Sequence, residues 1–229
     1  FYEEMQGIPD AEVKKQRRDF DKFDDYCDHL LVIDYDLPKS EDRVVGTYRL
    51  LRRSRLGNLD GFYSESEFDI SAIKKESGEI LELGRSCVDA AHRSRSLMNL
   101  LWRGIAEYVS LYDIKLMFGC GSFFGTDINE HKLALSYLYH YHLAPEELRA
   151  VALSEHYVEM NLMKKEEINV KEAFNAVPTL IKGYLRLGGY IGRGAVIDHN
   201  FNTVDVGIIV KTDLVTEKYA ERYARPRGI

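Results

Sequence analysis

The sequence predicts an α+β fold with a central, twisted, mostly antiparallel mixed sheet that is flanked by helices. Three observations predict this class. A hairpin of β-rich segments comes first, a strand–helix–strand unit follows, and a last pair of strands comes after a long helical stretch. A helix between two strands of one sheet makes those strands parallel, whereas hairpins are antiparallel. We expect one domain over residues 1–229, with a helical insertion at about 127–187.

The N-terminal hairpin is predicted from two segments rich in β-formers, residues 27–34 and 44–51. The intervening run Asp36-Leu37-Pro38-Lys39-Ser40 has the composition of a turn. A short charged helix is expected before the hairpin, over residues 11–18. The chain begins at Phe1 without an initiator methionine, so we expect N-terminal residues to be missing.

The strand–helix–strand unit is the most strongly patterned part of the chain. Residues 79–88 and 115–120 are apolar runs typical of strands, and residues 96–109 between them have helical periodicity. The apolar stripe of this helix consists of Leu97, Leu101, Ile105, Tyr108 and Val109. The two strands should therefore lie parallel in the sheet.

The second half of the sequence predicts helices over 129–140 and 178–187, followed by strands over 194–201 and 204–210. Residues 216–227 are highly charged and indicate a surface helix. A peripheral contact of this segment with the inner face of a membrane is an alternative, because two tyrosines are four residues apart on it.

Composition excludes several classes of function. A net charge of −6 disfavours nucleic-acid binding, which requires a basic face. No apolar run is long enough to span a bilayer, and no secretory leader precedes the fold, so we expect a cytoplasmic protein. Cys27, Cys87 and Cys120 show no C-x-x-C spacing, so we expect free thiols and no metal site.

Glu82 is a candidate catalytic residue because it interrupts an apolar strand, where a carboxylate is costly. Burial raises the pKa of a carboxyl group toward the value a general base needs. Strict alternation puts Glu82 and Arg85 on opposite faces, but a bulge at Gly84 would bring them together. A purely structural ion pair of Glu82 with Arg85 or Arg49 remains an alternative.

The basic turn before the central helix is a candidate anion site. A helix N-terminus offers free backbone N–H groups to phosphate, and Arg93 and Arg95 add positive charge there. An ordinary loop capped by Ser94 or Ser96 is the alternative. Neither G-x-G-x-x-G nor G-x-x-x-x-G-K occurs in the chain, so dinucleotide and P-loop sites are not predicted.

A strand, a basic turn and an amphipathic helix in this order resemble the acyl-donor site of the GNAT acyltransferases. Their Q/R-x-x-G-x-G/A turn is not matched, since residues 93–98 contain no glycine. This departure favours an acyl-carrier-protein thioester over coenzyme A as the donor. Most of the chain is similar to the ornithine N-acyltransferase branch of ornithine-lipid biosynthesis in bacteria, itself akin to acyl-homoserine-lactone synthases. The matching segments include Val45-Gly46-Thr47-Tyr48-Arg49-Leu50-Leu51, Leu81-Glu82-Leu83-Gly84-Arg85-Ser86-Cys87-Val88 and Leu100-Leu101-Trp102-Arg103-Gly104-Ile105.

The resemblance implies roles for the acceptor site. Glu82, in the family's E-x-x-R motif, would be the base or the ligand of the amine. Arg85 and Arg49 would hold a carboxylate or the acyl carbonyl oxygen. Asp28 matches the acidic position on the first strand and would bind the cationic end of the acceptor.

The resemblance also implies a donor site and a reaction. Arg93 and Arg95 would meet the phosphopantetheine arm, and the backbone N–H at Val88 would stabilise the thioester oxygen. The amine would attack the thioester directly, without a covalent enzyme intermediate.

The expected activity is transfer of a (3-hydroxy) fatty acyl group from acyl-carrier protein to the α-amine of an amino acid, ornithine first. Acyl-carrier protein is the expected partner, and no cofactor is expected besides this co-substrate, with acyl-coenzyme A as the alternative donor. An acyl-homoserine-lactone synthase, an N-acyl amino acid synthase with another acceptor, and a non-enzymatic lipid- or carrier-binding module are the alternatives.

Overall fold

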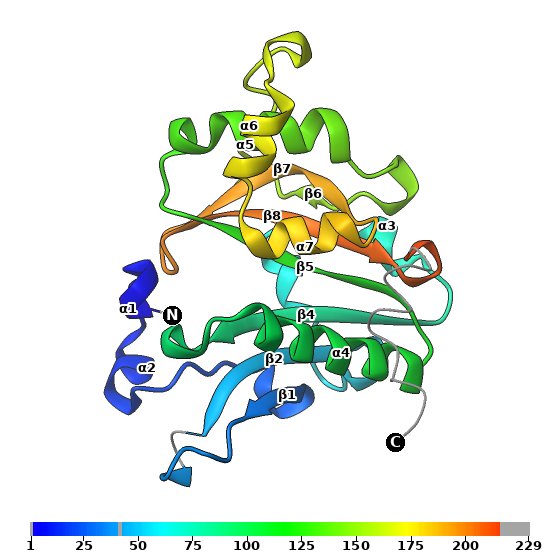
Figure 1. Cartoon of the computed structure of the whole chain (residues 1–229). Coiled ribbons are helices and arrows are strands. Elements are labelled where there is room, and N and C mark those ends of the chain that lie inside the picture. Colours follow the sequence, from blue (N-terminus) through cyan, green and yellow to red (C-terminus); the bar gives the residue numbers. More distant parts are fainter. Residues whose placement is uncertain (1, 41–42, 216–229) are drawn as a thin grey trace.

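A computed structural model describes residues 2–40 and 43–215 of the chain. Its centre is an eight-stranded sheet with the order β1-β2-β4-β5-β8-β7-β6-β3 (Figure 1). The β4–β5 and β6–β7 pairs are parallel and the other neighbours are antiparallel, as the sequence predicts for a mixed sheet. The strands are β1 (Asp28–Ile33), β2 (Val44–Arg52), β3 (Phe68–Asp69), β4 (Glu79–Val88), β5 (Ile114–Phe124), β6 (Val151–Ala152), β7 (Tyr190–Asp198) and β8 (Thr203–Lys211).

Helices pack on the sheet mainly from one side. In Figure 1, α4 crosses the β1–β2–β4 half, and α5, α6 and α7 lie over the β7–β8 half. The described α-helices are α1 (Tyr2–Met5), α2 (Ala11–Gln16), α3 (Ser71–Lys74), α4 (Arg95–Leu111), α5 (Ile128–His142), α6 (Val170–Ala176) and α7 (Thr179–Arg186). None of them is both long and apolar enough to cross a membrane. The expected surface helix over 216–227 lies outside the described residues.

Alternation along the strands divides the core into two clusters, one on each face of the sheet. Leu50 and Leu81 belong to the cluster that includes α4, α5 and α7. Leu51, Ile80 and Phe118 belong to the other cluster, with side chains from segment 62–73. Neighbouring residues of one strand thus face opposite ways, as period-2 geometry requires.

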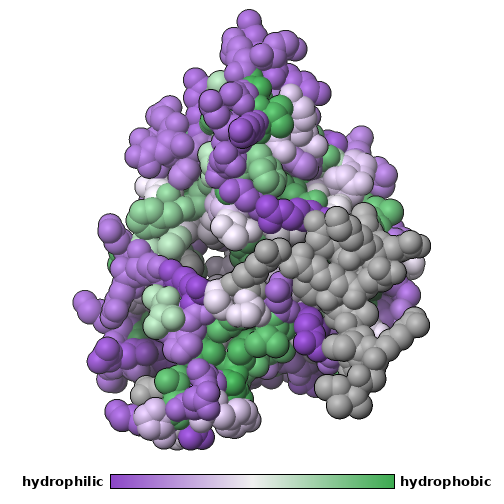
Figure 2. All heavy atoms as spheres, in the orientation of Figure 1, coloured by the Kyte–Doolittle hydropathy of each residue, from purple (hydrophilic) through white to green (hydrophobic). Residues whose placement is uncertain are grey.

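The parallel pair β4–β5 parts halfway along its length. Pairing runs from Glu79–Ile114 to Glu82–Phe118 and then ends, although β4 continues to Val88 and β5 to Phe124. Beyond this point β5 is paired only with β8 on its other side. Figure 2 shows the surface hollowed between the two halves of the molecule, at the level where these strands part, with apolar side chains below the hollow.

Candidate active site

A cavity of about 510 Å³ lies at the place where β4 and β5 separate. Leu83 and Leu180, which line it, belong to the helix-covered face of the sheet, whereas Leu51 and Cys120, which also line it, belong to the other face. The cavity therefore reaches through the sheet. Two ligands could approach the same point from opposite faces.

A β-bulge in β4 shapes one wall of the cavity. Thr47 of β2 is opposite Cys87 and Arg49 is opposite Gly84, so one residue of β2 faces two residues of β4. Arg85 is the residue of this bulge with a left-handed backbone, at φ 48°. The predicted bulge is thus present, at Arg85 rather than at Gly84. It puts the Arg85 side chain into the same cavity as Glu82.

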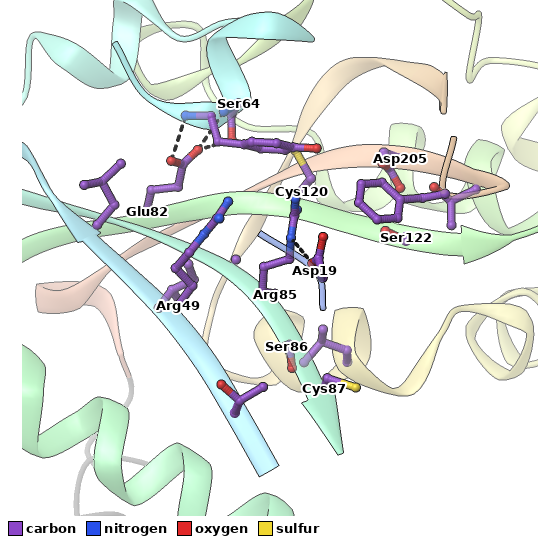
Figure 3. A pocket seen from close by; sticks show the side chains of 18 of the residues that line it. Asp19, Arg49, Ser64, Glu82, Arg85, Ser86, Cys87, Cys120, Ser122 and Asp205 are labelled. Carbon is purple, nitrogen blue, oxygen red and sulfur yellow. Dashed lines mark hydrogen bonds and ion pairs between the residues drawn. The ribbon is translucent and has the colours of Figure 1, made fainter. Parts of the chain in front are cut away.

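Glu82 is 5% exposed and lines the cavity. Its Oε2 accepts a hydrogen bond from the backbone N–H of Tyr63 at 2.9 Å (Figure 3). Its Oε1 accepts from the backbone N–H of Ser64 at 2.7 Å and from the Ser64 hydroxyl at 2.6 Å. Burial raises the pKa of Glu82, and the bonds from Ser64 and Tyr63 oppose the rise. The carboxylate both anchors segment 63–64 and lines the cavity.

The guanidinium groups of Arg49 and Arg85 are held by an acidic segment before β1. Arg49 Nη1 donates to Asp21 Oδ1 at 2.7 Å and to Asp24 Oδ1 at 3.1 Å. Arg85 Nε donates to Asp19 Oδ2 at 2.7 Å, and its Nη2 donates to Asp21 Oδ2 at 3.1 Å. Aspartates of this segment, and not Glu82, are therefore the ion-pair partners of both arginines, so the structure contradicts the alternative of a purely structural ion pair with Glu82.

The two arginines differ in how open they are to the cavity. The Arg49 side chain is 6% exposed and lies between Phe23 and Tyr63. The Arg85 side chain is 25% exposed and stacks on Tyr63 and Phe201. Arg85 is thus the guanidinium better able to meet a ligand.

Asp28 lies away from these residues, against our expectation. His29 is opposite Arg49 in the β1–β2 pair and lines the cavity, so the preceding residue points to the other face. There Asp28 Oδ2 accepts from the Tyr108 hydroxyl of α4 at 2.6 Å and from Arg52 Nη2 at 3.3 Å. Asp28 ties the edge strand to a helix, and it is not among the residues that line the cavity.

We expect Asp28→Asn to lower the free energy of unfolding by about 1 kcal/mol at pH 7, since hydrogen bonds to a charged group are weakened. The Tyr108 hydroxyl and then Arg52 hold the pKa of Asp28 below its usual value. The stability that the charged Asp28 carboxylate contributes is fully present above its pKa in the unfolded chain, about 3.9. It is lost as the pH falls through its lower pKa in the folded protein. Urea unfolding of both proteins at pH 7 and at low pH measures it.

Tyr108→Phe is the matched variant, because it removes the 2.6 Å bond and keeps the carboxylate. We expect both variants to keep the wild-type preference between cationic and neutral acceptors. A changed preference in Asp28→Asn alone would return Asp28 to the acceptor site.

The predicted donor residues lie at the end of β4 and at the start of α4. Val88 is the last residue of β4, in the part of the strand that is no longer paired with β5. Arg93 Nε donates to the Val88 carbonyl at 3.3 Å, and its guanidinium is paired with Glu4. Arg95 is the first residue of α4, and its side chain is outside the described part of the structure.

The first turn of α4 is capped in the ordinary way. The Ser94 hydroxyl accepts from the backbone N–H of Leu97 at 3.2 Å. The capped-loop interpretation is therefore confirmed for this turn. It does not exclude a donor site, because other N–H groups of a first helical turn lack partners within the helix.

Sequence reasoning missed several residues of the cavity. The acids that hold the arginines, Asp19, Asp21 and Asp24, lie in a short polar segment whose composition is that of a solvated loop. Asp205 and Thr203 of β8 also line the cavity. An acid within the apolar run of β8 is the same signal that identified Glu82, and it could have been found.

Comparison with known proteins gives matches over nearly the whole chain. Residues 1–103 match the family described as Acetyltransferase (GNAT) domain. The L-ornithine N(alpha)-acyltransferase of Agrobacterium fabrum is 46% identical over 226 residues, which cover 97% of this chain and 77% of that protein. The L-ornithine N(alpha)-acyltransferase of Rhodobacter capsulatus is 42% identical over 226 residues, with 98% and 86% covered. Among solved structures, the CoA-dependent acyl-homoserine lactone synthase MesI matches 92% of this chain and 78% of its own, at 15% identity and a TM-score of 0.45.

The match of residues 1–103 to the GNAT domain and the identity to curated N-acyltransferases over nearly the whole chain define it as an N-acyltransferase of the GNAT fold, in agreement with its parallel strand–helix–strand unit. The sequence-based fold class is confirmed. Within that class the chain belongs to the family of the L-ornithine N(alpha)-acyltransferases, since identity above 40% extends over nearly its whole length.

Proposed function

We propose that this chain transfers a fatty acyl group from an acyl-carrier-protein thioester to the α-amine of L-ornithine, the first step of lyso-ornithine lipid synthesis. The observation that carries the proposal is 46% identity over 97% of the chain to an L-ornithine N(alpha)-acyltransferase. The cavity supports it, because it joins both faces of the sheet and contains a buried carboxyl group. A donor on the α4 face and an acceptor on the other face would meet there.

In the proposed reaction the neutral α-amine attacks the thioester carbon. The C–N bond forms as the carbonyl electron pair moves onto oxygen, and collapse of this intermediate breaks the C–S bond. The proton that the amine loses goes to Glu82, and Glu82 then gives it up, directly or through water, to the departing thiolate, which leaves as the thiol and restores the carboxylate. Val88 lies six residues beyond Glu82 on β4, roughly 20 Å at full extension, so its backbone N–H is out of reach of an oxyanion formed beside Glu82.

Arg85 would hold the carboxylate of the acceptor. Its side chain is the more exposed of the two guanidiniums, at 25% against 6% for Arg49, and a planar guanidinium suits a carboxylate. Arg49, bound to Asp21 and Asp24, would fix the floor of the site instead. An amine without a carboxylate should then be a poor acceptor.

A direct test offers the purified protein a 3-hydroxyacyl carrier-protein thioester with ornithine, lysine, glycine, glutamine or putrescine, and identifies products by mass spectrometry. We expect Nα-acyl-ornithine to form at least about tenfold faster than any other product, since a tenfold preference needs only about 1.4 kcal/mol. Putrescine acylated as fast as ornithine would contradict the carboxylate contact. Release of methylthioadenosine from S-adenosylmethionine would identify an acyl-homoserine-lactone synthase instead.

The proposed donor is tested at the basic turn. We expect replacement of Arg93 and Arg95 by Ala to raise the KM for the carrier-protein thioester, more at low salt than at high salt, because ions screen charge pairing. Glu4→Gln is the matched control: it removes the partner of Arg93 and keeps the arginine, so KM should not rise. Equal kcat/KM for acyl-coenzyme A and acyl-carrier protein would contradict the proposed donor.

A further inference from the structure

A second group of acids lies beside the cavity, on the wall formed by β5 and β8. One carboxylate oxygen from each of Glu67, Asp198 and Asp205 lies within 4.8 Å of the other two. Glu67 lies between segment 63–66 and β3, Asp198 ends β7, and Asp205 lies in β8 opposite Ser122 of β5. We call these three residues the β8 acidic cluster.

Two polar atoms at this wall are buried without a partner. Asp205 is 5% exposed and lines the cavity, yet its Oδ1 has no hydrogen-bond partner among the described residues. The Thr203 hydroxyl is fully buried at the same wall and makes no hydrogen bond of good geometry among the described residues, but it and the Ser122 hydroxyl lie close enough to Asp205 to lower the pKa of that carboxyl group. A buried polar atom without a partner costs about 1–3 kcal/mol, so a ligand donor is expected here.

The charges around the cavity favour a cation at the same wall. Its described lining contains four carboxyl groups and two guanidiniums, and both guanidiniums are bound to the acidic segment at 19–24. No ion pair found among the described residues involves the β8 acidic cluster. Burial and the charge of Asp205 raise the pKa of Glu67 to about 8, and burial raises the pKa of Asp205 to about 6. A bound cation would stabilise the charged form of these buried, neighbouring carboxyl groups.

We propose that the β8 acidic cluster binds the side-chain ammonium of the acceptor amino acid. The inference rests on the proposed function and names the part of the site that selects a diamino acid. Figure 3 shows Glu82 and Asp205 toward opposite ends of the labelled side chains, with Arg85 and Cys120 between them. An α-amine near Glu82 and an α-carboxylate on Arg85 leave the side chain pointing toward Asp205.

An ammonium group fits this wall chemically. It has three N–H donors, and Asp205 Oδ1 and Thr203 Oγ1 of the cavity lining have no partner of good geometry among the described residues. Glu67 lies behind this lining: one of its carboxylate oxygens is within 4.8 Å of an Asp205 oxygen, and its Oε2 accepts from the Cys120 thiol at 3.4 Å. The Asp198 carboxylate is less available, since its Oδ1 already accepts from the backbone N–H groups of Asn200 and Phe201. An acceptor with an apolar side chain would leave these acids unpaired and should be rejected.

The test compares L-ornithine with L-norvaline, which has the same carbon chain without the terminal amine. Two quantities are measured on wild type, Asp205→Asn and Glu67→Gln: the ratio of kcat/KM for the two amino acids, and their Kd by calorimetry without the acyl donor. The ratio is independent of the active fraction of a preparation, so partial misfolding does not affect it. Asp69→Asn is the matched control, because it removes the same charge two residues from Glu67 at an exposed position.

We expect both cluster variants to lower the ornithine-to-norvaline ratio by about tenfold or more, and Asp69→Asn to leave it unchanged. Wild-type acylation of ornithine with an unchanged ratio in both variants would overturn the inference and leave the proposed function standing. Calorimetric binding of ornithine that the variants lose, without acylation by wild type, would overturn the proposed function and support the cluster. Ca²⁺ or Mg²⁺ that binds wild type and displaces ornithine from the cluster would make it a metal site and overturn the inference.

Discussion

Replacement of Glu82 by Gln should lower kcat by about 10²-fold or more, the usual effect of losing a general base. Gln has nearly the same size, and its amide oxygen can still accept hydrogen bonds from Ser64 or Tyr63, so we expect the fold to remain. The amide cannot take a proton from the amine at neutral pH. Steady-state kinetics on both proteins, with circular dichroism to check the fold, measure the effect.

Ser64→Ala separates the two roles of this carboxylate. It removes the 2.6 Å bond from the Ser64 hydroxyl and keeps the acid, so kcat should fall by less than tenfold. The lost bond favoured the charged form, so the raised pKa of Glu82 should rise further and the acid limb of kcat/KM should move to higher pH. Glu82→Gln turnover within a few-fold of wild type would show that Glu82 only anchors segment 63–66.

The fold was largely predictable because its main elements carry strong periodic patterns. The strand–helix–strand unit was found with correct order and direction, since the stripe of Leu97, Leu101 and Ile105 is clear. Strand ends were less accurate where glycines weaken the pattern. β7 begins at Tyr190 rather than at 194, and β5 continues past Cys120 to Phe124. The short helix over 11–18 was predicted and is present as α2 (Ala11–Gln16), whereas α1, α3, β3 and β6 have too few residues for any period.

The site was predictable only where a charge interrupts an apolar strand. Glu82 stands out in this way, the family resemblance adds Arg49 and Arg85, and the structure brings all three to one cavity. Asp28 was predicted on the wrong face of the sheet. Side chains of neighbouring strand residues point to opposite faces, so an error of one residue in the strand register reverses the predicted face. The aspartates at 19–24 could not be assigned, because only the tertiary fold brings them to the arginines.

Gly119→Ala should destabilise the protein far more than Gly84→Ala, which changes a glycine that lines the cavity. Gly119 of β5 follows the last residue that pairs with β4, at the point where the two strands part. A Cβ atom here would lie 2.2 Å from the carbonyl oxygen of Leu83. This neighbour is backbone and cannot rotate away, so one strand must move. We expect a loss of about 3 kcal/mol in the free energy of unfolding.

Gly84→Ala is the matched control from the facing strand. The nearest atom to its added Cβ is Arg49 Nε at 3.8 Å, an ordinary contact, so we expect a change of less than about 1 kcal/mol. Urea unfolding of both variants measures the difference, and equal stabilities would show that the approach of Gly119 to Leu83 is not constrained. In the proposed function the acyl donor enters where these strands part, so the strand shift forced by Gly119→Ala should also raise the donor KM. Gly84→Ala keeps the strand spacing, so its donor KM should stay near the wild-type value.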